Sequence, residues 1–191
     1  MHGGPRPQPL LPSRSPATAV LVVLSDSHRT DGTGLVGAAA DAVDEADAVL
    51  HAGDFTAEPV LDSLRELAPE LHAVHGNRDD PAVTDRLPAE TTFEYAGVTV
   101  AATHRHRSGA TGLTLLGRQQ GAELVVFGHS HRPSVEQTGE VTLLNPGSYA
   151  DPRGARQAFA TLRPSEAGLD GALVTVDGET FATFSVTPGE G

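Results

Sequence analysis

The first half of the chain alternates between short apolar runs and stretches in which apolar residues recur at helical spacing. Residues 18–24 are β-branched and apolar, which predicts a buried strand. A helix is then predicted from apolar positions three or four residues apart, at Leu35, Ala39, Val43 and Ala46. The pattern repeats with predicted strands at residues 48–51 and 71–75 and a helix at residues 58–67 between them. The apolar face of that helix comprises Val60, Leu61, Leu64 and Leu67.

The next segment combines a hairpin with one more helix and strand. Residues 91–95 and 98–103 predict two strands joined across Ala96-Gly97. Residues 113–120 predict a helix, and residues 124–127 predict another buried strand.

From residue 133 onward helical periodicity fades and short strands prevail. Turns are predicted at Thr138-Gly139 and Asp177-Gly178, and residues 164–171 are predicted to be a polar loop. Residues 1–16 hold five prolines and few apolar partners, which predicts a flexible tail before a single domain over residues 17–191. The whole pattern predicts a mixed α/β fold with a β-rich C-terminal part.

Side chains that can bind metal follow five of the six strands predicted in the first two thirds of the chain, the exception being residues 91–95. They are Asp26 and His28, then Asp54, then Asn77, then His104 and His106, and finally His129 and His131. The carboxyl ends of strands in such folds line one edge of the sheet, so we expect these side chains to meet there. Each motif alone is a weak signal, but each of the five comes just after a predicted strand, and this regular placement is a strong one.

The chain contains no cysteine, so any metal must be held by His, Asp, Glu or Asn. Imidazole, carboxylate and amide oxygen suit divalent transition metals, and one carboxylate can bridge two cations about 3.5 to 4 Å apart. The sequence therefore predicts a dinuclear metal site.

The order Asp-x-His, Gly-Asp, Gly-Asn, His and Gly-His-x-His resembles the calcineurin-like metallophosphoesterase superfamily, especially its small archaeal and bacterial phosphodiesterase branch. The resemblance covers residues 20–148, including the turn Asn145-Pro146-Gly147-Ser148. It implies a four-layer αββα sandwich in which two mixed β-sheets are flanked by helices.

The resemblance also implies the ligands and the reaction. Asp26, His28 and His131 would hold one divalent ion, Asn77, His104 and His129 the other, and Asp54 would bridge both. Mn2+ is the first choice of metal, with Ni2+, Fe2+, Co2+ and Zn2+ as alternatives. The implied activity is hydrolysis of a small phosphate ester, expected to be a diester, by in-line attack of a metal-bound water or hydroxide. The residues expected to take part in catalysis are Asp54, Asn77, Arg78 and His106.

The sequence departs from the family pattern at two positions. Arg78 stands where many relatives carry a histidine that protonates the leaving group, and arginine cannot give up its proton near neutral pH. The general acid is thus unassigned, and Arg78 could instead bind phosphate oxygens. Arg105 replaces a usual glycine, and Arg105 and Arg107 could either reach a substrate phosphate or be solvated. His106 could contact substrate or water.

Other polar residues near these motifs are expected to be structural. Asp79 and Asp80 are predicted to cap a short helix over residues 81–86. His51, His72 and His75 lie in or beside predicted strands and are expected to pack or cap.

The charge balance limits the partners. The net charge is -12, and all 13 basic residues are arginines, so bulk nucleic-acid binding is not expected. The acidic excess resembles proteins of salt-loving organisms, which predicts an unfolding midpoint that rises between low and molar KCl. No apolar run is long enough to cross a bilayer, so we expect a cytoplasmic protein without membrane contact.

Two other uses of the same residues remain open. The fold can serve as a non-catalytic protein-binding scaffold, as in the retromer subunit that resembles this branch but has lost part of the ligand set. A structural site for a single metal ion is the other alternative. Exposed edge strands in the C-terminal hairpins would also allow chains to pair as homo-oligomers.

Overall fold

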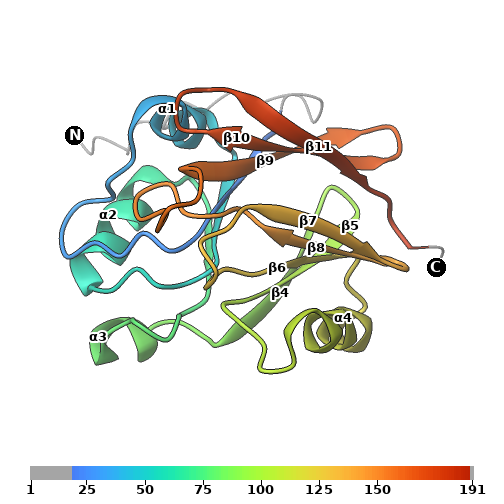
Figure 1. The fold of residues 1–191 in the computed structure, drawn as a ribbon, viewed down its shortest axis with the longest axis horizontal. Coiled ribbons are helices and arrows are strands. Elements are labelled where there is room, and N and C mark those ends of the chain that lie inside the picture. Colours follow the sequence, from blue (N-terminus) through green and yellow to red (C-terminus); the bar gives the residue numbers. More distant parts are fainter. Residues whose placement is uncertain (1–18, 190–191) are drawn as a thin grey trace, which may run out of the picture.

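Two β-sheets pack face to face, and helices cover their outer faces (Figure 1). The computed structural model describes residues 19–189, so the predicted proline-rich tail lies outside the described residues. The predicted four-layer αββα sandwich with two mixed sheets is confirmed. Within residues 19–189, no helix has the length and apolarity needed to cross a membrane.

The first sheet has six strands in the order β11-β10-β9-β1-β2-β3. Its parallel half is β1 (Leu21–Leu24), β2 (Ala48–His51) and β3 (Leu71–Ala73). Its antiparallel half is β9 (Ala158–Ser165), β10 (Gly168–Thr175) and β11 (Thr180–Val186). The outer face of this sheet is covered by α1 (Gly37–Glu45) and α2 (Glu58–Leu67), and the short α3 (Pro81–Thr84) contacts α2.

The second sheet has five strands in the order β4-β5-β6-β8-β7. The strands are β4 (Glu90–Tyr95), β5 (Val98–Thr103), β6 (Leu124–Val126), β7 (Ser134–Thr138) and β8 (Val141–Asn145). The three central strands, β5, β6 and β8, run parallel, and the two edge strands are antiparallel to their neighbours. The helix α4 (Gly109–Gln120) covers the outer face.

The apolar runs of the sequence are explained by sheets that are buried on both faces. In β1, Leu21 and Val23 point into the cluster between the sheets, whereas Val22 and Leu24 point into the cluster under α1 and α2. Successive side chains of a strand alternate between faces, so a strand covered on both sides needs apolar residues throughout. The core thereby fixes β1 in the middle of the molecule, with its carboxyl end at the edge where the other parallel strands also end.

Two details of the sequence prediction are wrong. Leu67 is 55% exposed, because it is the last residue of α2 and the buried Ala68 follows it into the core. Residues 164–171 are not a polar loop but the end of β9, a two-residue turn and the start of β10. Pro164 is tolerated in β9 because it lies beyond Leu162, the last residue that pairs with β1, so its missing N–H costs no bond to that strand.

The buried stripe of α2 gives a stability prediction with an internal control. Leu61 is fully buried between α2 and the first sheet, so Leu61→Ala should lower the free energy of unfolding by about 2 to 5 kcal/mol. Leu67→Ala, the same change at an exposed position of the same helix, should alter it by no more than about 0.5 kcal/mol. Urea unfolding of both variants measures the difference. Equal losses would mean that α2 packs through a different face.

Candidate metal centre

The predicted donors arrive where parallel strands of both sheets end. Asp26 and Asp54 come from the loops after β1 and β2, and His104 follows β5 directly. His129 and His131 come from the loop after β6. Four of the donors are almost fully buried although they are polar, namely Asp26, Asp54, His104 and His131. Buried ionisable groups need partners, so this cluster requires compensating charge.

The first group of donors consists of Asp26, His28 and His131, and one donor atom from each lies within 4.8 Å of the others. The Nε2 atom of His131 is 3.3 Å from Asp26 Oδ1 and 3.2 Å from His28 Nε2. The two imidazole rings are stacked, with centroids 4.9 Å apart. Two ring nitrogens and a carboxylate oxygen therefore face one small space.

The second group consists of Asp54, His104 and His129, whose donor atoms meet the same distance criterion. His104 Nε2 lies 3.3 Å from Asp54 Oδ2, and the ring of His129 stands edge-on to that of His104. The same oxygen, Asp54 Oδ2, is also 3.3 Å from His28 Nε2 in the first group. One carboxylate oxygen thus lies between imidazole nitrogens of both groups.

The rings of His104 and His131 are each oriented by a hydrogen bond from Nδ1, the nitrogen that faces away from the cluster. His104 Nδ1 donates to the carbonyl of Ala52 at 2.8 Å, and His131 Nδ1 donates to the carbonyl of Asp151. Each bond directs Nε2 of the ring into the cluster, the arrangement that metal-ligating histidines commonly show. His104 Nε2 is buried and has no hydrogen-bond partner among the described residues, despite the carboxylate 3.3 Å away. A lone pair opposite a carboxylate needs a cation or a proton, so the donor set fits a metal.

The pKa values of Asp54 and His104 also indicate that the cluster needs positive charge. Burial alone would raise the pKa of Asp54, but His104 and the backbone N–H of Arg78 lower it to about 2. Burial alone would lower the pKa of His104, yet the Asp54 carboxylate raises it above its ordinary value. Both shifts favour positive charge beside the Asp54 carboxylate.

Backbone strain is concentrated at the predicted donors. Positive φ angles occur at non-glycine residues Asp26 (54°), His28 (45°), Asp54 (60°), His129 (70°) and His131 (58°). Such conformations cost of the order of 1 to 3 kcal/mol each and persist only where the surroundings impose them. Gly76 and Gly128 meet a related demand, because a Cβ atom on either would collide with the carboxylate of Asp54 or Asp26 respectively. The glycines before Asn77 and His129 thus allow close approach of the donors.

Asp79 braces the loops that carry Asp54 and Asn77. Its carboxylate accepts hydrogen bonds from the backbone N–H groups of Thr56 (2.6 Å), Gly76 (2.7 Å) and Asp54 (3.2 Å). The predicted capping role is correct only for Asp80, which accepts from the N–H of Val83 at the start of α3. Asp79 instead joins the loops after β2 and β3, because its side chain turns back toward them.

The turn after β8 joins the loops that carry Asp26 and His129. Asn145 donates from Nδ2 to the carbonyl of Gly128 at 2.8 Å, and Ser148 donates from Oγ to the carbonyl of Asp26 at 2.7 Å. Asp26 in turn accepts from the N–H of His129 at 2.9 Å. The Asn-Pro-Gly-Ser turn is therefore a brace for the donors of both sheets.

The remaining predicted site residues lie at the rim. Asn77 and Arg78 line an open cavity of about 460 Å³, and the N–H of Arg78 donates to Asp54 Oδ1 at 2.8 Å.

His106 is exposed and belongs to neither donor group; its Nδ1 accepts from the N–H of Ser108 near the start of α4. Arg105 is close enough to His129 to contribute to the lowering of its pKa, after burial and His104.

Two of the three histidines predicted to pack or cap, His51 and His72, pack against aromatic rings. His51 is fully buried against Phe55, and burial lowers its pKa to about 3, which keeps the ring neutral. His72 stacks on Phe93 and contacts Glu70 at 3.1 Å. His75 contacts the carbonyl of Gly76 through Nδ1.

Arg153 and Asp151 were missed by the sequence prediction. They line the same cavity as Asn77 and Arg78, and Arg153 Nη2 is 3.2 Å from His28 Nε2. The only signal in the sequence is that they closely follow the Asn-Pro-Gly-Ser turn.

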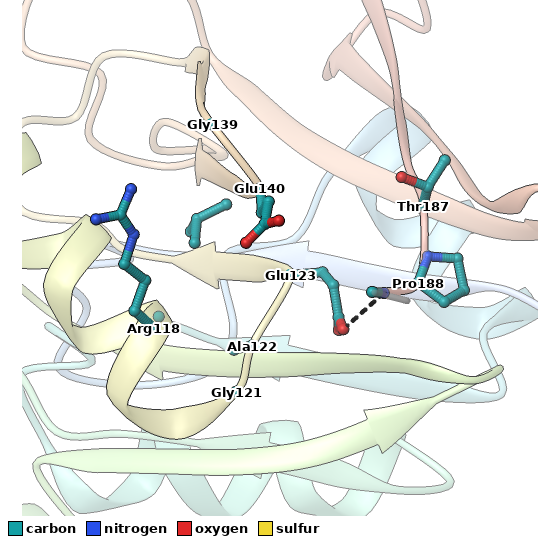
Figure 2. Close-up of a pocket in the computed structure, with 11 residues that line it drawn as sticks. Arg118, Gly121, Ala122, Glu123, Gly139, Glu140, Thr187 and Pro188 are labelled. Carbon is teal, nitrogen blue, oxygen red and sulfur yellow. Dashed lines mark hydrogen bonds between the residues drawn. The ribbon is translucent and has the colours of Figure 1, made fainter. Parts of the chain in front are cut away.

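A second cavity of about 780 Å³ lies elsewhere, between the end of α4, the β7–β8 turn and residues 187–189 (Figure 2). Glu123 lies in it and accepts a hydrogen bond from the N–H of Gly189 at 2.9 Å (Figure 2). None of the predicted donors lines this cavity, so its size does not make it the candidate site.

Comparisons with known proteins agree with the geometry. The model of the calcineurin-like phosphoesterase superfamily domain matches residues 20–167. A probable metallophosphoesterase of Methanocaldococcus jannaschii is 33% identical over 141 residues, which are 71% of each chain. Phosphodiesterase YfcE of Escherichia coli is 33% identical over 104 residues, 52% of this chain and 55% of YfcE.

Solved structures show the same fold. Vps29 of Entamoeba histolytica superposes with a TM-score of 0.72 at 22% identity, covering 87% of this chain and 99% of Vps29. The family match spans the strands and loops that carry every predicted donor. The chain belongs to the calcineurin-like phosphoesterase superfamily.

Proposed function

We propose that the chain is a dinuclear metal-dependent phosphodiesterase. In the proposed site, Asp26, His28 and His131 hold one divalent ion, and Asn77, His104 and His129 hold the other. Asp54 bridges the two ions. The observation that carries the proposal is the position of Asp54 Oδ2, 3.3 Å from one imidazole nitrogen of each donor group.

The charge of the proposed site suits an anionic substrate. Its ligands include only two carboxylates, Asp26 and Asp54, so two divalent ions leave a local net charge of about +2. When bound, such a pair of ions supplies a water of lowered pKa and neutralises charge on the phosphoryl oxygens. The site can thereby attract a small phosphorylated molecule despite the net charge of -12. The mixture of imidazole, carboxylate and amide donors supports Mn2+ as the metal, with Ni2+, Fe2+, Co2+ and Zn2+ as alternatives.

The residues around Asn77 favour a substrate whose leaving group needs little help. Arg78 lines the cavity but cannot donate a proton near neutral pH, so a leaving group there must depart with little help. The similarity to phosphodiesterase YfcE supports a phosphodiester as the substrate. Arg78 is proposed to bind phosphate oxygens, while its backbone N–H holds Asp54 through Oδ1 and leaves Oδ2 to face the donor nitrogens.

A non-catalytic scaffold and a single structural metal site make different predictions. A scaffold would show no turnover with both sites filled, and a structural site would bind one ion per chain. The likeness to Vps29, at 22% identity, is one of fold and does not favour the scaffold.

The shared carboxylate gives the main prediction. Asp54→Asn keeps the size of the side chain but removes the charge, so it should lower Mn2+-supported hydrolysis of bis-p-nitrophenyl phosphate by more than about 100-fold. Bound metal, measured by elemental analysis, should fall below two ions per chain. Asp44→Asn, an exposed change on α1, serves as the control and should leave both quantities unchanged. The proposal fails if the wild-type protein with two ions bound is inactive, or if Asp54→Asn retains full activity.

The brace at Asp79 gives a second prediction with its neighbour as control. Asp79→Asn replaces an acceptor-only carboxylate by an amide and should remove at least one of three backbone hydrogen bonds. Metal affinity should fall about 10- to 100-fold, because the loops that carry Asp54 and Asn77 lose their fixed position. Asp80→Asn should have no such effect, because asparagine caps helices well. Metal titration followed by calorimetry distinguishes the two, and equal affinities would refute the role of Asp79.

A further inference from the structure

The loop after β8 brings an arginine to the proposed metal site. Arg153 lies at the mouth of the 460 Å³ cavity, and its Nη2 atom is 3.2 Å from His28 Nε2. Its backbone has φ +47° and is followed by Gly154 at +85°, so the chain makes a tight left-handed bend at this position. This bend directs a long cationic side chain back toward a donor that is 125 residues away in the sequence.

We propose that Arg153 binds the phosphoryl oxygens of the substrate and that Asp151 is the positioning residue for its guanidinium group. This inference rests on the proposed function, because it concerns the substrate of the same site. It assigns to Arg153 a role in substrate affinity rather than in holding metal.

The orientation of the guanidinium group supports this role. Arg153 Nε donates to Asp151 Oδ2 at 3.0 Å, which anchors the group, while its Nη2 atom lies 3.2 Å from His28 Nε2. A cation that takes the lone pair of His28 Nε2 would displace Arg153 Nη2 from it, since that nitrogen has a single acceptor pair. The Asp151 bond would still hold the guanidinium group at the mouth. Its planar fork of N–H donors matches the oxygens of a phosphate.

Asp151 links this arginine to a metal donor. The carbonyl of Asp151 accepts from Nδ1 of His131, while its carboxylate accepts from Arg153. The N–H of Asp151 donates to Ser148 Oγ at 2.8 Å, and Ser148 in turn binds the carbonyl of Asp26. Asp151 thus contacts both Arg153 and the loops that carry His131 and Asp26. It thereby sets the distance between the proposed ions and the guanidinium group.

Two cationic side chains line the cavity and can interact with an anionic ligand. Arg78 and Arg153 both line it, together with Asp79 and Asp151. Both acidic side chains are already engaged, Asp79 with backbone N–H groups and Asp151 with Arg153. The volume lies in the usual range for small-molecule sites. The competing explanation is an ordinary surface ion pair, since the Arg153 side chain is 51% exposed, and it predicts no effect on ligand binding.

The test uses the full chain, inorganic phosphate as the probe, and the variants Arg153→Ala, Arg153→Lys and Asp151→Asn. Arg156→Ala is the matched control, because Arg156 is exposed and lies over the ring of Phe181, outside the residues that line this cavity. Calorimetry measures the Kd of phosphate with and without Mn2+, and elemental analysis measures bound metal. Steady-state kinetics with bis-p-nitrophenyl phosphate give KM and kcat.

Arg153→Ala should retain the wild-type metal content but raise the Kd of phosphate about 10-fold or more, the loss expected for a charge-assisted hydrogen bond. KM should rise by a similar factor and kcat should change less. Arg153→Lys should recover part of the affinity, and Asp151→Asn should show a smaller loss than Arg153→Ala. Arg156→Ala should match the wild type.

The inference is overturned if Arg153→Ala binds phosphate as the wild type does, if the wild type binds no phosphate at millimolar concentration, or if Arg153→Ala loses metal. Failure of the proposed function has a different signature. In that case the wild type is inactive with metal bound or binds no metal, whereas the comparison of phosphate Kd values between wild type and Arg153→Ala still decides the role of Arg153.

Discussion

A single carboxylate oxygen, Asp54 Oδ2, stands between imidazole nitrogens supplied by both sheets of the fold. His28 follows β1 of the first sheet, and His104 follows β5 of the second. Asp54 is buried, and the neighbouring His104 Nε2 has no hydrogen-bond partner among the described residues, so the ionised carboxylate requires nearby positive charge. The lowered pKa of Asp54 and the raised pKa of His104 follow from that constraint.

The rest of the structure keeps the donors in an arrangement that the chain would not adopt locally. Five predicted donors have left-handed backbone conformations, which the surroundings must stabilise. The braces are side chains outside the donor set: Asp79 joins the loops after β2 and β3, and Asn145 and Ser148 join the loops after β6 and β1. Packing on both faces of β1 supplies the rigid base from which these loops depart. Core burial therefore stabilises the fold, and loop hydrogen bonds position the donors.

Local patterns were enough to predict the framework. The strand β2 and the helix α2 have the predicted bounds, because apolar runs and helical spacing are properties of neighbouring residues. The arrival of candidate donors at one edge of each sheet was also predictable, because they follow parallel strands, but the meeting of the two edges depends on how the two sheets pack. The prediction of a loop over residues 164–171 failed because the effect of Pro164 depends on where pairing with β1 stops, which is set by tertiary structure.

The braces and the rim could not be found in the same way. Asp79 has the sequence context of a helix cap, and only the fold shows that its carboxylate turns to Thr56, 23 residues earlier. Arg153 contacts His28, although the two residues are 125 positions apart in the sequence. Contacts between distant loops leave no periodic signal, so the sequence indicated the candidate donors but not the residues that position their loops or line the cavity beside them.

The central claim is that two ions share Asp54, and anomalous diffraction tests it most directly. Crystals grown with excess Mn2+ would be measured at the manganese absorption edge. The dinuclear assignment predicts two anomalous peaks about 3.5 to 4 Å apart, one beside Asp26, His28 and His131 and the other beside Asn77, His104 and His129, with Asp54 contacting both. A single peak, no peak, or two peaks that Asp54 does not join would contradict it.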